Sequence, residues 1–427
     1  MQTVLATAES TSRASMVQKT VSSGGIESWL VEDYTVPLIA LEFAFKGGAA
    51  QDPPGKPGTA MLLAGLLDEG AGSYDAEGFH RALDESAIEI SFSADRDMLT
   101  GRMQTLSWNA DRAFTLLRLA VTEARLDEEP FERVRGQIAA SLKREINDPD
   151  FVAGRRFRAL AYPGHPYGRP VRGELASLPG LTRTGLVAMR SSMFARDNLK
   201  IAAVGAIEAA TLGCRLEDVF GSLPQKPELV PVAEAALSGT GTRHVEVIDL
   251  PQSAIRFGRE GLARKDPDFI AATVLNHILG GGIFSARLFR EVREKRGRAY
   301  SISSQLVTHD HAALFFGSTS TKNERAADSL AIIENEILDL SENGPTEDEL
   351  DNAKQYLIGS YPLRFDTSTR IASQLTALQM EGFGIEYLDE RNRLIAAVTL
   401  EDARRAAERL FGNGKLLIAI AGRPKGL

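Results

Sequence analysis

The feature that most constrains the fold is an apolar segment that occurs in similar form in both halves of the chain. The apolar segment LKIAAVG at 199–205 resembles LLIAIAG at 416–422, and each is the last strand expected in its half of the chain. Two apolar strands that end in glycine can match by chance, but the elements around them also recur in the same order. Each half is expected to hold a hairpin, a helix, further strands, long helices and a final strand, so we interpret the chain as a duplication.

This duplication predicts an α+β fold of two tandem similar halves, each a mostly antiparallel sheet packed with helices. Residues 25–45 are expected to form the hairpin of the first half, since two apolar runs flank a turn. Composition changes between Gly221 and Gly241, where three prolines occur in a stretch typical of a linker. We therefore predict an N-terminal domain at 1–222, a linker at 223–241 and a C-terminal domain at 242–427.

Composition argues against several classes of protein. The chain has 49 basic and 57 acidic residues, a net charge of −8, which disfavours a nucleic-acid surface. It has no apolar run of about eighteen residues, so no membrane span is expected. Cys214 is the only cysteine, which excludes an intrachain disulfide, and we interpret it as a small buried hydrophobe. The polar N-terminus predicts no signal peptide in this chain, and a periplasmic protein with its signal removed and a cytoplasmic protein both stay open.

The most informative stretch runs from Leu279 to Ser304. The glycines Gly280 to Gly282 are interpreted as a flexible entry, that is, a flexible segment that leads into a helix. The two sides of this helix differ in character. Its apolar positions are Leu288, Phe289 and Val292, and its arginines, spaced by three, are Arg287, Arg290 and Arg293. Gly297 is expected to end the helix, and the following AYSISS to form a strand. Arg293 and Tyr300 would then lie on the two sides of one turn and point into one cavity.

Taken singly, these parts have ordinary interpretations: a loop, a solvated arginine face and a packed tyrosine. Together, LGGG-x-FS-x-RLF-x-E-x-REKRG-x-AYS resembles the C-terminal-half signature of the M16 (pitrilysin-like, inverzincin) metallopeptidases. The resemblance covers most of the chain, since GHPYGRPVRG at 164–173 resembles the HPYG loop of the family and RDNLKIAAVG at 196–205 its closing strand. It implies the fold of M16 peptidases and LuxS-like metallohydrolases.

The resemblance also implies site residues. In the family an arginine and a tyrosine at this spacing reach into the active site, which here would make Arg293 and Tyr300 catalytic. It further implies that the glycine-rich segment lines a closed chamber and binds substrate. The residues concerned are Gly280, Gly281, Gly282, Phe284 and Ser285. Members of this length pair with a second chain to build the chamber.

One departure from the family is decisive for the prediction. Family enzymes carry H-x-x-E-H on the first long helix, where two histidines bind zinc and the glutamate activates water. The matching context here is PGTAMLLAGLLDEGA at 57–71, and the histidine positions hold Met61 and Gly65. The glutamate position holds Ala64. A thioether is a soft, weak ligand and the other two residues offer none, so the resemblance implies no zinc on this chain.

No other constellation replaces the motif. The histidine pair in His309-Asp310-His311 lies at a polar turn, which we interpret as a hairpin tip rather than a metal site. His165 belongs to the HPYG loop and is expected to shape it, and His277 is expected to have a core or interface role. The sequence also lacks G-x-S-x-G and a P-loop, so the nucleophiles and phosphate sites of those motifs are not expected.

The sequence therefore predicts the non-zinc subunit of a heterodimeric M16B-type metallopeptidase. Its partner would be a second M16 chain that carries H-x-x-E-H and zinc, and this chain would supply Arg293 and Tyr300 in trans. The substrate would be an unfolded peptide bound in extended form. Two alternatives stay open: a non-catalytic structural or peptide-binding protein, and a self-sufficient peptidase with relocated zinc ligands.

Overall fold

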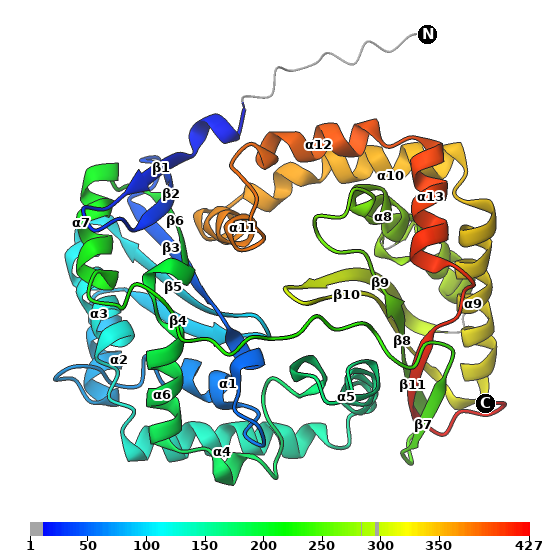
Figure 1. The fold of residues 1–427 in the computed structure, drawn as a ribbon, viewed down its shortest axis with the longest axis horizontal. Helices are drawn as coiled ribbons and strands as arrows, with labels where there is room; N and C mark the ends of the chain where they lie inside the picture. The colour runs from blue at the N-terminus through cyan, green and yellow to red at the C-terminus, as the bar shows by residue number, and fades with distance from the viewer. Residues whose placement is uncertain (1–11, 283, 295–298) are drawn as a thin grey trace.

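The computed structural model describes residues 12–282, 284–294 and 299–427, and it contains two sheets. The strands of the first sheet are β1 (Gln18–Val21), β2 (Glu27–Glu32), β3 (Leu38–Lys46), β4 (Glu89–Ala94), β5 (Met98–Leu106) and β6 (Leu199–Gly205). The strands of the second are β7 (Arg243–Val247), β8 (Gln252–Glu260), β9 (Ala299–His309), β10 (Ala312–Lys322) and β11 (Leu417–Gly422). The two sheets lie on opposite sides of the molecule (Figure 1).

The two sheets share one topology. The first has the order β1-β2-β6-β3-β5-β4 and the second β7-β11-β8-β10-β9, so the second repeats the first without β1. In each, one pair is parallel, β2 with β6 and β7 with β11, and the other pairs are antiparallel. This confirms the predicted α+β fold of two similar halves with mostly antiparallel sheets. The exact domain boundaries stay a prediction.

Helices cover both sheets. Those of the first half are α1 (Thr59–Ala64), α2 (Ala76–Glu85), α3 (Ala110–Thr122), α4 (Glu128–Glu145), α5 (Pro149–Ala161), α6 (Arg183–Met193) and α7 (Ala209–Phe220). Those of the second are α8 (Phe269–Asn276), α9 (Ala326–Asn343), α10 (Glu347–Gly359), α11 (Ser368–Met380), α12 (Tyr387–Ala397) and α13 (Leu400–Phe411). No described helix is both long enough and apolar enough to span a bilayer.

One helix from each half covers the sheet of the other half. α11 packs on β3 and β6 of the first sheet, and α5 packs on β8 and β11 of the second (Figure 1). This exchange explains why a similar apolar segment occurs in both halves of the sequence. Because β6 and β11 have helices on both faces, nearly every residue in them is buried, and a strand buried on both faces reads as a continuous apolar run.

The duplication extends to single glycines at the ends of these strands. Gly205 ends β6 with φ +132° and Gly422 ends β11 with φ +146°, a region of backbone conformation that favours glycine. A Cβ on Gly205 would collide with the carbonyl oxygen of Leu38, and one on Gly422 would lie 2.5 Å from Ser253 Oγ. The glycine at the end of each of the two similar segments is therefore required by the same local geometry.

Two expectations are wrong. β2 and β3 do not form a hairpin, because β6, from far along the chain, lies between them and pairs with both. Cys214 is exposed on α7 rather than buried. The pattern of apolar residues identified these elements but not the long-range pairing or the helix face on which the cysteine lies.

Candidate functional site

The resemblance to M16 peptidases places the zinc helix of that family at α1. The carboxylate of Asp52 accepts hydrogen bonds from the backbone N–H groups of Gly58 at 2.7 Å and Ala60 at 2.8 Å, and so fixes the start of this helix. Ala64 is buried, while Met61 and Gly65 lie on a partly exposed face. Across the described ranges, no three histidine, cysteine or acidic side chains gather in a way that could hold a metal ion.

The glycine-rich segment is an ordered turn in the described residues. α8 continues into a π-helical turn at His277–Gly281. A Cβ on Gly280 would lie 2.5 Å from Ser304 Oγ of β9, and one on Gly282 would lie 2.8 Å from Nε2 of His277. The glycines therefore allow the turn to pack closely against β9 and His277, which the interpretation as a flexible entry did not anticipate. His277 is buried, as predicted for a core histidine, and its ring stacks on exposed Tyr356 at 4.8 Å.

The predicted catalytic arginine lies on a second π-helical turn, Phe289–Glu294. Its guanidinium lies 4.8 Å above the ring of Phe289, and that ring meets Phe284 edge to face at 5.2 Å. Arg293 is exposed and Phe284 is 69% exposed, so this stack presents a cation and an aromatic ring to solvent. Ser285 donates to the carbonyl of Gly282 at 3.3 Å and ties the stack to the glycine turn.

The second predicted catalytic residue is only partly described. The backbone of Tyr300 belongs to β9, directly after the described gap, but its side chain lies outside the described residues. Gly297, the expected helix end, also lies outside them. That the side chains of Arg293 and Tyr300 point into one cavity therefore stays a prediction.

Arg287 anchors the arginine-bearing turn to two other helices. Its Nε and Nη2 donate to the carboxylate of Glu349 at 2.7 and 2.6 Å, and its Nη1 donates to Asp339 at 2.7 Å. Glu349 also closes the capping box of α10 with Thr346. Arg287 is only 8% exposed, so the arginine row is not a single solvated face. Instead the first arginine is held in the interior while Arg293 reaches the surface.

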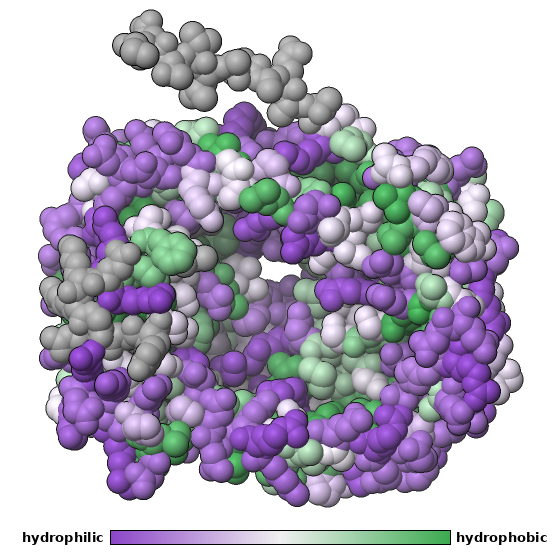
Figure 2. Space-filling view, turned by 180° about the vertical axis from the view of Figure 1, so that it is seen from behind, coloured by the Kyte–Doolittle hydropathy of each residue, from purple (hydrophilic) through white to green (hydrophobic). Residues whose placement is uncertain are grey.

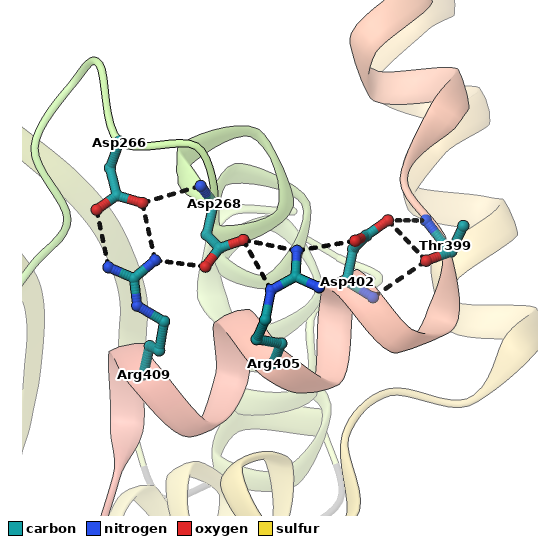
Figure 3. A network of polar contacts seen from close by, with 6 residues as sticks. All are labelled: Asp266, Asp268, Thr399, Asp402, Arg405 and Arg409. Atoms are coloured by element: carbon teal, nitrogen blue, oxygen red, sulfur yellow. Dashed lines mark hydrogen bonds and ion pairs between the residues drawn. The ribbon is translucent and has the colours of Figure 1, made fainter.

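A second network holds α8, the helix that leads into the glycine turn (Figure 3). Arg405 of α13 donates to Asp268 at the start of α8 at 2.8 Å and also to Asp402 at the same distance. Arg409, one turn later, forms two hydrogen bonds with Asp266, at 2.9 and 2.8 Å, and another with Asp268. These hydrogen bonds lower the pKa values of Asp266 and Asp268, and they hold the start of α8 against α13.

The predicted hairpin tip at His309-Asp310-His311 is confirmed, since β9 and β10 pair up to His309 and Ala312. This tip meets the first half at Tyr167, a residue for which the sequence predicted no role. Its hydroxyl donates to Asp97 at 2.6 Å and accepts from the backbone N–H of His311 at 3.0 Å. The only sequence signal for this junction was the HPYG loop, in which His165 accepts from the N–H of Tyr167 and so shapes the loop as expected.

Comparisons with known proteins agree with this fold and with the sequence resemblance to M16 peptidases. The family described as the peptidase M16 inactive domain matches residues 180–357. A non-peptidase homolog, YmxG, of Helicobacter pylori is 27% identical over 79% of this chain and 78% of its own length. An uncharacterized zinc protease of Streptomyces coelicolor is also 27% identical, over 87% of this chain and 82% of its own length.

Solved structures resemble the whole chain. A peptidase M16 inactive domain from Pseudomonas fluorescens superimposes with a TM-score of 0.88 at 27% identity, covering 96% of this chain and 98% of that one. A protease from Helicobacter pylori superimposes with a TM-score of 0.85 at 18% identity, covering 95% of this chain and 99% of that one, and supports the fold alone. Taken with the family match over residues 180–357, these likenesses show that the chain is similar to M16 peptidases in sequence and in fold.

Proposed function

We propose that this chain is the non-zinc subunit of a heterodimeric M16 metallopeptidase and completes the active site of a partner chain. The observation that carries the proposal is the exposed stack of Arg293, Phe289 and Phe284 beside the ordered glycine turn. An exposed cation supported by aromatic rings is suited to binding a group that another molecule brings. π-helical turns, two of which occur in this segment, are also frequent at functional sites.

The chemistry divides between the two chains. Met61, Ala64 and Gly65 do not fit a zinc ion, so the metal and the water that it activates would belong to the partner's H-x-x-E-H site. Arg293 would bind a carbonyl oxygen of the peptide through its fixed set of N–H donors. Tyr300, as a hydroxyl donor, would stabilise the negative charge that develops on the oxygen of the attacked carbonyl. Gly280 to Gly282, Phe284 and Ser285 would line the path of an extended, unfolded peptide.

A second candidate is a non-catalytic structural or peptide-binding protein. It is favoured by the absence of zinc-ligand side chains on α1 and by the name of the Helicobacter pylori relative as a non-peptidase homolog. In that case Arg293 would contribute to binding alone. The two candidates differ in what happens when a chain with an intact H-x-x-E-H motif is added.

The test is to purify this chain with a candidate H-x-x-E-H chain and to measure zinc content and cleavage of a quenched fluorescent peptide. The complex is expected to contain zinc and to cleave the peptide. The partner alone should contain zinc, but neither chain alone should cleave the peptide. Arg293→Ala and Tyr300→Phe should each lower kcat by about a hundredfold without preventing assembly, the range typical of a lost oxyanion donor.

Arg290→Ala is the matched control, because Arg290 lies on the same turn and is also exposed but has no assigned role. Its activity should equal that of the unmodified complex. Full activity in the Arg293 and Tyr300 variants would refute the catalytic assignment. A stable complex without peptide cleavage would favour the non-catalytic candidate.

A further inference from the structure

His277 is a buried, titratable side chain at the base of the glycine turn, and the proposed function assigns it no role. It is the first residue of the π-helical turn His277–Gly281 and is 7% exposed. Its ring stacks on that of Tyr356 of α10, with the ring centres 4.8 Å apart and the planes at 24°. Tyr356 is 58% exposed, so its ring forms the solvent-facing side of the stack and the imidazole the inner side.

The backbone of the glycine turn lies against the ring of His277. A Cβ on Gly282 would lie 2.8 Å from Nε2 and 2.9 Å from Cε1 of this ring, so the glycine packs onto the edge of the ring that carries Nε2. The N–H of Gly282 donates to the carbonyl of His277 at 2.9 Å and closes the turn. Because Gly282 is itself buried, water reaches this edge of the ring only when the glycine moves away.

The same glycine also fixes the start of the segment that carries Arg293. The carbonyl of Gly282 accepts from the N–H of Ala286 at 2.8 Å and from Ser285 Oγ at 3.3 Å. The carbonyl of Ala286 in turn accepts from the N–H of Arg290 at 3.1 Å, inside the second π-helical turn. Gly282 therefore joins the buried histidine on one side to the arginine-bearing turn on the other.

No charged side chain in the described structure compensates a proton on His277. Its turn packs against α8, α9, α10 and β9. β9 presents the uncharged Ser304 to Gly280, and α10 presents Tyr356, the titratable side chain that contacts the ring. Burial alone lowers the pKa of His277, and no described acidic or basic side chain of these four elements contributes to the shift. At neutral pH the ring is therefore uncharged.

Protonation of a buried imidazole costs free energy, because the interior solvates an ion poorly. The cost is avoided when the ring reaches water, which here requires Gly282 to leave the ring. In the open turn the histidine has its ordinary pKa of about 6.5, and in the closed turn burial holds the pKa lower. The open turn thus binds protons first, so the closed turn has its full stability above about pH 6.5 and loses stability as the pH falls below that value.

We infer that His277 is a pH switch for the glycine turn. With a neutral ring the turn is closed on the histidine, and with a protonated ring Gly282 leaves the histidine and the turn opens. The switch itself stands without the proposed function. Under that function, a peptide enters the hollow at the centre of the molecule (Figure 2) and runs along Gly280 to Gly282, so its binding would weaken in acid.

The test is amide hydrogen exchange of the full chain alone from about pH 7.5 to about pH 5.5, corrected for the pH dependence of the intrinsic exchange rate. Protection of Gly280 to Gly282 should fall about three- to tenfold over this range, since one proton taken up on opening changes the ratio of open to closed turn by at most about tenfold per pH unit. In His277→Gln, whose side chain cannot take up a proton, the protection should not depend on pH.

His80→Gln is the matched control. His80 lies on α2 with a side chain 48% exposed, and its ring pairs with Glu69 at 3.3 Å. This substitution also removes one histidine, but from the other half of the chain. The pH dependence of protection in the glycine turn should therefore stay as it is in the unmodified chain.

Protection that stays constant or rises as the pH falls would overturn the inference, because it would show that the charged ring is stable in place against Tyr356. Equal pH dependence in His277→Gln and the unmodified chain would overturn it as well. If His277→Gln does not fold, Tyr356→Ala decides. This variant exposes the ring in the closed turn and should at least halve the pH dependence, whereas an unchanged dependence would contradict the switch.

These measurements use neither a zinc chain nor a peptide, so the inference and the proposed function can fail separately. A turn without pH dependence, found beside an active two-chain mixture, removes only this inference. A turn that opens in acid, found beside an inactive mixture, removes only the proposed function.

Discussion

At the scale of single residues, a phenylalanine ring packs directly against each of two glycines and leaves no room there for a side chain. Gly101 pairs with Phe43 across the first sheet, and Gly317 pairs with Phe257 across the second. A Cβ on either glycine would collide with the facing ring. We expect Gly317→Ala to lower the free energy of unfolding by about 1–3 kcal/mol, the usual cost of overpacking a core. Chemical denaturation measures this change.

The control for this substitution is Gly136→Ala. Gly136 lies inside α4, and no heavy atom lies within 4 Å of the Cβ that the substitution would add. Since alanine is the better helix former, this variant should be more stable by up to about 1 kcal/mol. Loss of stability in both variants to the same extent would show that the facing ring is not the cause.

The arginine row shows how far the sequence predicts at this scale. Spacing by three correctly indicated a helical turn with Leu288, Phe289 and Val292 in the core. The spacing could not show that Arg287 is buried, because the carboxylates that pair with it, those of Asp339 and Glu349, lie far away in the sequence. Local periodicity reports the geometry of one element, whereas the burial of a charge depends on partners from other elements.

At the scale of elements, the ion-pair network between α13 and α8 makes acid stability depend on two carboxylates. Asp266 and Asp268 have pKa values held below the ordinary range, chiefly by hydrogen bonds from Arg409 and Arg405 respectively. A carboxylate whose pKa is lower in the folded state contributes stability above its unfolded pKa of about 4, and this contribution is lost as the pH falls through the lowered value.

We expect Arg409→Met to lower the free energy of unfolding by about 1–3 kcal/mol at neutral pH, because it removes charge-assisted hydrogen bonds to both carboxylates. The difference from the unmodified chain should shrink as the pH falls below about 4, where the carboxylates lose their charge. Unfolding free energies measured across this range test both points. Arg393→Met, which breaks an exposed pair with Glu390, should show neither effect.

Strand pairing shows the limit of the sequence at this scale. The apolar runs at 25–45 correctly indicated two strands, and their proximity suggested a hairpin. β6 lies between them because its two faces are both apolar and need cover from two layers of helices, which only the centre of the sheet offers. The run LKIAAVG carried this information, but its place in the sheet depends on pairing between segments far apart.

At the scale of the whole molecule, Tyr167 joins the two halves at their hairpin tips. It is 1% exposed and bridges Asp97 in the first half and the N–H of His311 in the second. Burial alone would raise the pKa of Asp97, but hydrogen bonds from His309 and Tyr167 bring it below its ordinary value. We expect Tyr167→Phe to lower the unfolding free energy by about 1–3 kcal/mol, because Asp97 loses a donor in the interior.

Denaturation of Tyr167→Phe at neutral and acidic pH measures this loss, which should be larger at neutral pH, where Asp97 is charged. Tyr356→Phe is the control, since Tyr356 is 58% exposed and stacks on His277 through its ring rather than its hydroxyl. Its stability should change by less than about 0.5 kcal/mol. An equal loss in both variants would rule out a special role for the junction.

The exchange of α5 and α11 makes each sheet depend on the half to which it does not belong. Leu375 of α11 is fully buried and packs in one cluster with Trp29, Ala202 and Val204 of the first sheet. We therefore expect Leu375→Ala, a change in the second half, to cost about 2–5 kcal/mol and to raise amide hydrogen exchange in β6 of the first half. Leu363→Ala, at a leucine 69% exposed, should alter neither quantity. If Leu375→Ala raised exchange in α11 alone and left β6 protected, the halves would be independent folding units that merely touch.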